Sequence, residues 1–189
     1  MSKTNTIFKS FIVVPMIATS LSVNTMTTSM SSLVSQITGA PVQDVSTTQT
    51  PEQKLREEHA AKIDAYFAQY DMPLAGYGMK MVLEAEKHDV DWRMIPAIAV
   101  RESTGGIHAC KSVKFSPFGF GSCRISFKSY DDAIEVIAKN LGGNNPNTAA
   151  YYDGKTNRQI LQSYNPPSVI PKYADEVMSI MNKIDDMDA

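Results

Sequence analysis

A glutamate at the end of an apolar helical pattern is the residue of this chain best suited to acid catalysis. Glu102 continues the i, i+3, i+4 spacing of one helix face that Ile95 and Ile98 begin. The spacing therefore places a carboxylate where a core residue is expected. A carboxylate withdrawn from water favours its protonated form, and a general acid needs a proton held near neutral pH. We expect Glu102 to be that acid; the alternative is a surface carboxylate at a helix end.

The segment that follows Glu102 has the composition of a saccharide-binding loop. Gly105 and Gly106 end the helix. Residues 106–130 contain no Asp or Glu, but they contain five aromatic and four basic residues: Phe115, Phe118, Phe120, Phe127, Tyr130, Lys111, Lys114, Arg124 and Lys128. Aromatic faces stack on sugar rings, and loop backbone can orient acetamido groups. This pattern predicts a glycan groove, although at least one of Phe118 and Phe120 is expected in the core.

The chain has two cysteines, Cys110 and Cys123, both in this segment. In an exported protein a pair so close in sequence is expected to form one disulfide, with two buried thiols as the alternative. Closing this loop would stabilise the fold by up to about 3 kcal/mol. We expect no metal site and no cofactor, because His108 is the only nearby histidine and there is no second cysteine pair.

The N-terminal region is typical of an exported protein. Residues 1–23 are interpreted as a signal peptide, with Lys3 and Lys9 before an apolar run too short to be a stable membrane span. Residues 24–50 are rich in Ser and Thr and are expected to be a disordered linker. A secreted, periplasmic or cell-envelope location follows; the alternative is a tail with a chance apolar patch. The net charge of −2 argues against a nucleic-acid partner.

The remaining residues, 51–186, are predicted to form one mostly α domain (α+β) with one small β-hairpin or loop element in residues 106–130. Apolar residues at helical spacing predict helices beginning at Pro51, Met79, Trp92, Tyr130, Asn157 and Tyr173. Thr50, Ser129 and Thr156 are expected to cap three of them, and Asp89 or Asp91 a fourth. Residues 143–155 are predicted to be a loop.

Four segments resemble motifs of the lysozyme-like superfamily, which includes lytic transglycosylases and bacterial glucosaminidases. Residues 97–106 (AIAVRESTGG) resemble its A-x-x-E-S-x-x-G helix end. Three later segments resemble glucosaminidase motifs in the same order: residues 116–121 (SPFGFG) resemble N-x-F-G-x, residues 127–134 (FKSYDDAI) resemble F-x-S-W-x-E-A-I, and residues 164–167 with 173–177 (YNPP, YADEV) resemble Y-x-P…Y-A-x-x-V. The resemblance spans roughly residues 89–184.

The resemblance implies a lysozyme-like fold and a monomeric glycoside hydrolase, of endo-β-N-acetylglucosaminidase or lytic transglycosylase type. Its partner would be peptidoglycan glycan strands, and Glu102 would protonate a β-1,4 bond. The residues expected to bind substrate are Ser103, Ser116, Phe118, Gly119, Phe120, Tyr151 and Tyr164. Ser103 is also expected to satisfy the helix end, and Ser116 stands where the family usually has Asn.

The loop of residues 106–130 offers no second carboxylate, which predicts a mechanism with a single catalytic carboxylate. Asp131 and Asp132 are possible distant bases, but their place in a first helical turn favours helix capping. Two other functions are compatible with the same residues. One is a catalytically inactive module that binds cell-wall glycan, and the other is a disulfide-stabilised secreted protein that binds another protein.

Overall fold

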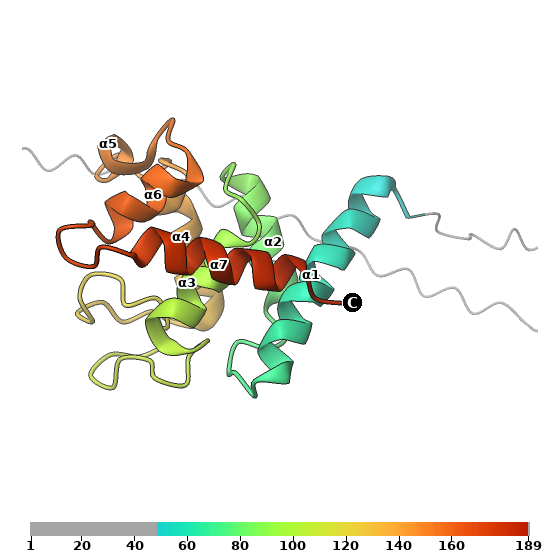
Figure 1. The fold of residues 1–189 in the computed structure, drawn as a ribbon. Helices are drawn as coiled ribbons and strands as arrows, with labels where there is room; N and C mark the ends of the chain where they lie inside the picture. Colours follow the sequence, from blue (N-terminus) through green and yellow to red (C-terminus); the bar gives the residue numbers. More distant parts are fainter. Residues whose placement is uncertain (1–48, 189) are drawn as a thin grey trace, which may run out of the picture. The chain divides into compact units, whose positions relative to one another are not determined.

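The structure of the protein, a computed structural model, describes residues 49–188. The expected signal peptide and all but the last two residues of the expected linker lie outside this range. Seven helices are present in the described part (Figure 1): α1 (Pro51–Gln69), α2 (Gly78–Lys87), α3 (Met94–Ser103), α4 (Tyr130–Leu141), α5 (Ala149–Tyr152), α6 (Asn157–Tyr164) and α7 (Tyr173–Asp185). The prediction of a mostly α fold is confirmed.

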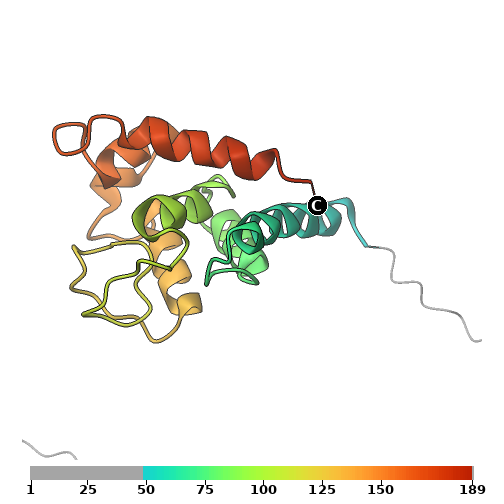
Figure 2. The same ribbon diagram turned by 60° about the horizontal axis from the view of Figure 1, so that its bottom comes forward.

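Helix α3 is the centre of the domain. It packs against α7, α2 and α4, and Figure 2 shows it between α7 and α4. Ile95 and Ile98 are fully buried, as their spacing predicts. Pro96 lies in the first turn of the helix, where its missing N–H costs no helical hydrogen bond. The end of α3 that carries Glu102 is thus fixed by packing on several sides.

Three of the predicted helix caps are confirmed. Thr50 and Thr156 each form a capping box with a glutamine three residues later. The hydroxyl of Ser129 accepts a hydrogen bond from the backbone N–H of Asp132 at the start of α4. Local sequence therefore determines where α1, α4 and α6 begin.

The predicted Asp89 or Asp91 cap of the third helix is wrong. The residue before α3 is Arg93, which makes no side-chain capping bond. Asp91 instead pairs with Arg93 at 2.7 Å and accepts a hydrogen bond from the amide of Asn157 at 2.9 Å. Arg93 also pairs with Asp185 at 2.9 Å. Asp91 also accepts a hydrogen bond from the backbone N–H of Arg93 at 3.1 Å. It therefore fixes the turn before α3, while the contacts with Asn157 and Asp185 tie this turn to α6 and α7.

The expected β-hairpin is not found: no strand occurs within residues 49–188. The two arms of the loop do approach each other, since the N–H of Phe127 donates to the carbonyl of Lys114 at 3.0 Å. However, Phe115, Ser122 and Cys123 have left-handed backbone angles, with φ between 51° and 59°. Such residues interrupt the extended backbone that a strand ladder requires. The loop is therefore irregular and closed by cross-links.

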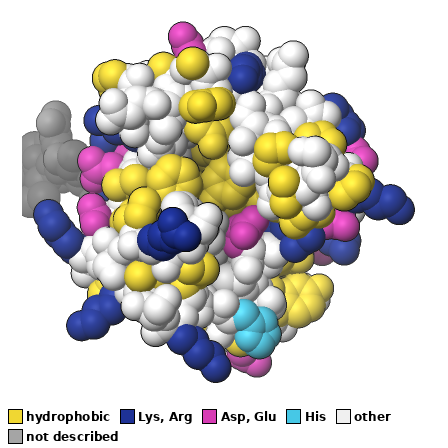
Figure 3. Space-filling model, turned by 90° about the vertical axis from the view of Figure 1, so that its left-hand side faces the viewer, with side chains coloured by type: hydrophobic (Ala, Val, Ile, Leu, Met, Phe, Trp, Pro, Cys, Tyr) yellow, Lys and Arg dark blue, Asp and Glu magenta, His cyan; other side chains and the backbone are white. Residues whose placement is uncertain are grey.

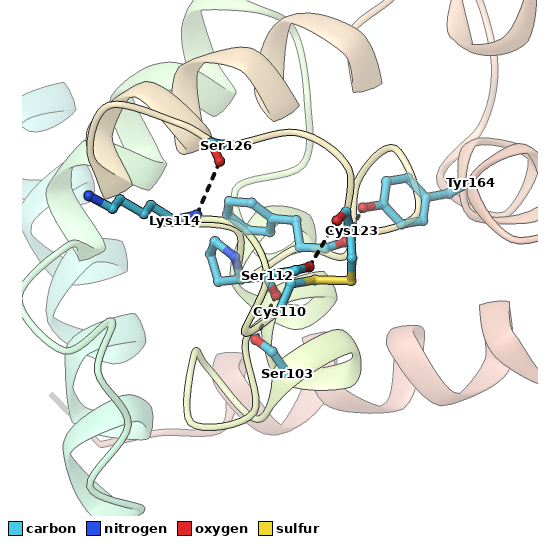
Figure 4. The surroundings of a disulfide bond; sticks show 9 residues. Ser103, Cys110, Ser112, Lys114, Cys123, Ser126 and Tyr164 are labelled. Atoms are coloured by element: carbon cyan, nitrogen blue, oxygen red, sulfur yellow. Dashed lines mark hydrogen bonds between the residues drawn. A yellow bond between two sulfur atoms is a disulfide. The ribbon is translucent and has the colours of Figure 1, made fainter.

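One of those cross-links is the predicted disulfide between Cys110 and Cys123, which is present (Figure 4). Elsewhere, the segment of residues 143–155 that was expected to be a loop contains the single-turn helix α5. Among residues 49–188, no helix combines the length and the hydropathy that a membrane crossing requires.

Removing the disulfide should destabilise the domain without unfolding its helices. Replacing Cys110 and Cys123 by Ser frees a loop whose ends are 13 residues apart, which should lower the free energy of unfolding by about 2–3 kcal/mol. Thermal and denaturant unfolding followed by circular dichroism would measure this. Wild-type protein treated with a reductant should match the double variant, and identical unfolding of oxidised and reduced protein would contradict the prediction.

Candidate functional site

Glu102 lines a groove of about 310 Å³ formed by residues that are distant in sequence. The lining comes from the end of α3, the loop after it, α5, the end of α6 and the segment after α6: Glu102, Gly119, Phe120, Gly121, Ser122, Tyr152, Tyr164, Asn165, Pro166 and Val169. Figure 3 shows this side of the molecule, with an apolar trough and an acidic side chain in its middle. Among the lining residues, Glu102 supplies the only carboxylate.

The carboxylate of Glu102 is held by the first residue of α7. The hydroxyl of Tyr173 donates a hydrogen bond to Oε1 of Glu102 at 2.7 Å, and Tyr173 itself is only 1% exposed. Arg101 lies over the Tyr173 ring, 5.6 Å from its centroid, and pairs with Glu176 of α7 at 2.7 Å. Packing of α7 on α3 thus fixes Oε1, while Oε2 lies on the side of the loop.

Burial raises the pKa of Glu102 above that of an ordinary glutamate, although the Tyr173 hydrogen bond and the charge of Arg101 each lower it in part. Burial and the charge of Glu102 raise the pKa of Tyr173 far above its usual range, so Tyr173 stays a neutral donor. The pair therefore retains a proton on Glu102 at a higher pH than an exposed glutamate would. A groove carboxylate with this property can act as a general acid.

The second carboxylate oxygen faces the backbone of the loop. Gly119 has a φ of +62°, and a Cβ atom added there would lie 2.6 Å from Oε2 of Glu102. Glycine is required at this position for two reasons, because other residues are strained at this φ and because a side chain would collide with the carboxylate. The backbone of the loop therefore approaches Glu102 closely at Gly119.

Two hydroxyl groups hold this part of the loop against the helices. Oγ of Ser103 donates to the carbonyl of Pro117 at 2.6 Å and accepts from the N–H of Gly106 at 2.9 Å. From the other side, the hydroxyl of Tyr164 donates to the carbonyl of Phe118 at 2.6 Å. Figure 4 shows both side chains reaching the loop near the disulfide. The peptide units before Gly119 are thereby fixed relative to Glu102.

The structure brings together some of the predicted substrate-binding residues and places others elsewhere. Gly119, Phe120 and Tyr164 line the groove with Glu102. Ser103 and Phe118 are buried behind it and act on the loop rather than on a ligand. The predicted contact of either with substrate is therefore not supported by their positions.

Ser116 and Tyr151 are also absent from the residues that line the groove. Ser116 is fully buried, and its hydroxyl finds no hydrogen-bond partner within the described part of the chain. Tyr151 is 60% exposed and points away from the core, whereas its neighbour Tyr152 lines the groove. A single turn of helix determines which of the two tyrosines faces the groove, and the pattern around them did not indicate that turn.

The most important residue that the sequence analysis did not assign to the site is Tyr173. The sequence places Tyr173 at the start of the last helix and in the last of the resembling motifs, without a role at the site. A buried tyrosine usually needs a hydrogen-bond partner for its hydroxyl. Its presence therefore indicates that a polar group lies opposite, but it does not identify the residue. Tyr164 lies between Tyr173 and Phe120. Its ring centroid is 6.1 Å from that of Tyr173, with the two ring planes nearly parallel, and 6.4 Å from that of Phe120.

The acidic residues considered as distant bases lie outside the groove. Asp132 caps the turn before α4, since its Oδ2 accepts from the N–H of Lys128 at 2.9 Å, and neither Asp131 nor Asp132 lines the groove. Within residues 49–188, no three His, Cys, Asp or Glu side chains are grouped as metal ligands would be. The described groove thus offers one acid and no second carboxylate.

Comparisons of the chain with protein-family models, with curated proteins and with solved structures found no match.

Replacing Gly119 by Ala should disturb the carboxylate as well as the backbone. Gly154 is a matched control, because it has a similar φ of +64° but open space where a Cβ would be. Gly154→Ala should cost about 1–2 kcal/mol of stability from backbone strain alone, and Gly119→Ala about 1–3 kcal/mol more because of the collision with Glu102. Thermal unfolding of both variants measures the difference, and equal losses would show that Gly119 does not touch the carboxylate.

Replacing Tyr173 by Phe should raise the pKa of Glu102 further, because the bond it removes stabilises the ionised form. A carboxyl group whose pKa is higher in the folded than in the unfolded protein supports folding at low pH. That support disappears as the pH rises through the folded pKa. The variant should therefore lose stability more steeply between acidic and neutral pH than the wild type does.

Carboxyl titration by NMR and unfolding at several pH values would test this expectation. Tyr152→Phe is the control, since Tyr152 also lines the groove but has no hydrogen bond to Glu102. An unchanged Glu102 titration in Tyr173→Phe would mean that the hydrogen bond does not influence the ionisation of Glu102.

Proposed function

We propose that the protein is a glycosidase that cleaves β-1,4 bonds between N-acetylated amino sugars in peptidoglycan, with Glu102 as the general acid. The observation that carries the proposal is the pairing of Glu102 with Tyr173 in a groove lined by aromatic rings and polar loop backbone. A retained proton, a sugar-binding surface and access from solvent are the three requirements for the first step.

The resemblance to the lysozyme-like superfamily supports the same reaction. Three of the four resembling segments contribute to the surroundings of one carboxylate, although they are separated in sequence. The helix end supplies Glu102, residues 116–121 supply Gly119, and the last motif supplies Tyr164 and Tyr173. If the resemblance of these segments were due to chance, they would have no reason to lie together around Glu102.

In the first step Glu102 protonates the glycosidic oxygen as the C1–O bond breaks. Tyr173 occupies Oε1, so Oε2 is the oxygen that carries the proton to the leaving group. The ionised Glu102 that results is stabilised by the Tyr173 hydrogen bond, which strengthens as charge develops. Tyr173 thus assists by positioning the carboxylate and by stabilising its charged form.

The same carboxylate completes the reaction as a base. No other Asp or Glu lines the groove, so the positive charge that develops at C1 is quenched by a group of the substrate or by water. If the substrate's own 6-hydroxyl attacks, Glu102 takes its proton and an anhydro-sugar forms. If the acetamido oxygen attacks first, Glu102 activates the water that opens the ring intermediate, and a reducing sugar forms.

The disulfide supports a location outside the reducing cytosol, because such bonds persist in oxidising compartments. Peptidoglycan in the cell envelope would be accessible there, either to a secreted protein or to one retained in the envelope. The proposed substrate and the proposed location are therefore compatible.

Replacing Glu102 by Gln should reduce cleavage about 10²- to 10⁴-fold, because the acid is lost while the shape of the side chain is kept. Products from purified peptidoglycan, identified by mass spectrometry, would report cleavage, the bond that is cut and whether the new end is an anhydro-sugar. Binding to the same material should remain, since Gln can still accept the Tyr173 hydrogen bond. Glu135→Gln, at an exposed position on α4, is the control.

The Glu102→Gln variant should also have a free energy of unfolding at neutral pH that is at least as large as that of the wild type. Burial disfavours the charge of Glu102, and its raised pKa means that the ionised form is the costly one in the folded protein. A wild-type protein that binds peptidoglycan but releases no product would point to an inactive binding module. Wild-type protein that neither binds nor cleaves glycan would contradict the proposal altogether.

A further inference from the structure

The loop beside the groove carries an unusual concentration of positive charge. Residues 107–128, here called the basic loop, contain four of the eighteen Lys and Arg residues of the chain and none of its twenty Asp and Glu residues. The four are Lys111, Lys114, Arg124 and Lys128, and all are exposed. The protein as a whole is slightly acidic, so this loop is a locally positive region of an acidic protein.

None of these four cations forms an ion pair within the described part of the chain, although the carboxylate of Asp132 accepts a hydrogen bond from the backbone N–H of Lys128. No charged side-chain nitrogen of the four lies within 4.0 Å of a described carboxylate, whereas Arg56, Arg93 and Arg101 each form a close ion pair. Figure 4 shows the side chain of Lys114 extending away from the disulfide. An uncompensated cluster of exposed cations attracts anions over distances of about 10 Å at moderate ionic strength.

The cross-links of the loop bring these cations together in pairs. Lys111 and Arg124 each follow one cysteine of the disulfide directly in sequence. Lys114 is joined through its backbone to Phe127, the residue before Lys128. The disulfide and the hydrogen bond thus join the two arms of the loop at two places, and each place has a basic residue on both arms. A bound anion can interact with cations from both arms.

The basic loop is continuous with the groove. Its residues 119–122 line the groove beside Glu102, and Arg124 follows two residues later. Exposed apolar side chains of the same loop, Ile107, Phe115 and Ile125, are 40–47% exposed. A ligand in the groove that extends toward this loop would therefore meet both cations and apolar surface.

We propose that the basic loop binds the carboxylate groups of the peptides attached to a peptidoglycan strand while the groove binds its glycan. This inference rests on the proposed function. Peptidoglycan peptides branch from the sugar chain itself, so a strand in the groove brings their carboxylates to the edge of the site. Their alanine methyl groups suit the exposed apolar side chains, and their acidic groups suit the lysines and Arg124. The protein would then prefer peptide-bearing strands to bare glycan.

The test compares a charge-reversed loop with a control of equal net charge. The full chain with Glu102→Gln, which prevents degradation of the ligand, is combined with Lys114→Glu and Arg124→Glu. The control carries Lys139→Glu and Lys183→Glu, which are also exposed and without a described ion pair but lie on α4 and α7. Binding is measured by sedimentation with intact peptidoglycan and with the same material stripped of its peptides by an amidase.

Reversal of the loop charges should weaken binding to intact peptidoglycan about tenfold, as expected for two or more surface ion pairs. Binding to stripped glycan should be unchanged, and the control variant should behave like its parent. About 0.5 M salt should remove most of the difference, because exposed pairs are screened. Mass spectrometry of the intact disulfide and circular dichroism establish that the variants are folded.

Three results would overturn the proposal. Equal affinity of the Glu102→Gln protein for intact and stripped peptidoglycan would mean that the peptides are not recognised. If the charge reversal weakened binding to intact and to stripped peptidoglycan equally, the loop would bind the glycan and not the peptides. Binding to anionic phospholipid vesicles that the loop variant alone loses, with peptidoglycan binding retained, would assign it to a membrane surface. In each case cleavage of glycan by the protein with Glu102 intact would leave the proposed function standing, whereas absence of any glycan binding or cleavage would defeat both.

Discussion

The hydrogen bond from Tyr173 to Glu102 is the interaction on which the arrangement of the groove depends. It joins residues 71 positions apart at 2.7 Å, and it exists only because α7 packs along α3. Ion pairs at both ends of α3 secure that packing: Arg93 with Asp185 near its start and Arg101 with Glu176 near its end. A partly buried carboxylate needs such a partner, because without one its charged form would be desolvated at a large cost.

The loop opposite Glu102 is positioned by a different set of constraints. A disulfide closes it, and hydroxyls of Ser103 and Tyr164 bind two successive carbonyls just before Gly119. These bonds satisfy buried backbone groups of an irregular segment that has no strand or helix partner. They also fix the distance between the loop backbone and the carboxylate. The cost is a backbone with several left-handed residues, of which Phe115 is the bulkiest.

The same loop carries two chemically distinct surfaces. Its groove side, from Gly119 to Ser122, is mostly backbone and aromatic ring, and it meets one partly buried acid. Its outer side carries Lys114 and Arg124 and no acidic residue. A polymer with neutral sugars and acidic branches matches both surfaces at once, which neither a plain polysaccharide nor a simple anion would do. The division of the loop therefore suits the branched glycan proposed as substrate.

The sequence by itself determined the features that depend on near neighbours. Capping by Thr50, Ser129 and Thr156, the mostly helical fold and the position of Glu102 at a helix end before two glycines all follow from spacing of a few residues. The disulfide was predictable because the chain has only two cysteines.

Only the tertiary structure decided which residues meet. The choice of Tyr152 over Tyr151, the burial of Ser116 and Phe118, and the loss of the expected β-hairpin depend on how distant helices pack. A periodic pattern identifies the buried face of a helix, but it does not identify what lies opposite that face. The partner of Glu102 could therefore be found only after α7 was placed on α3.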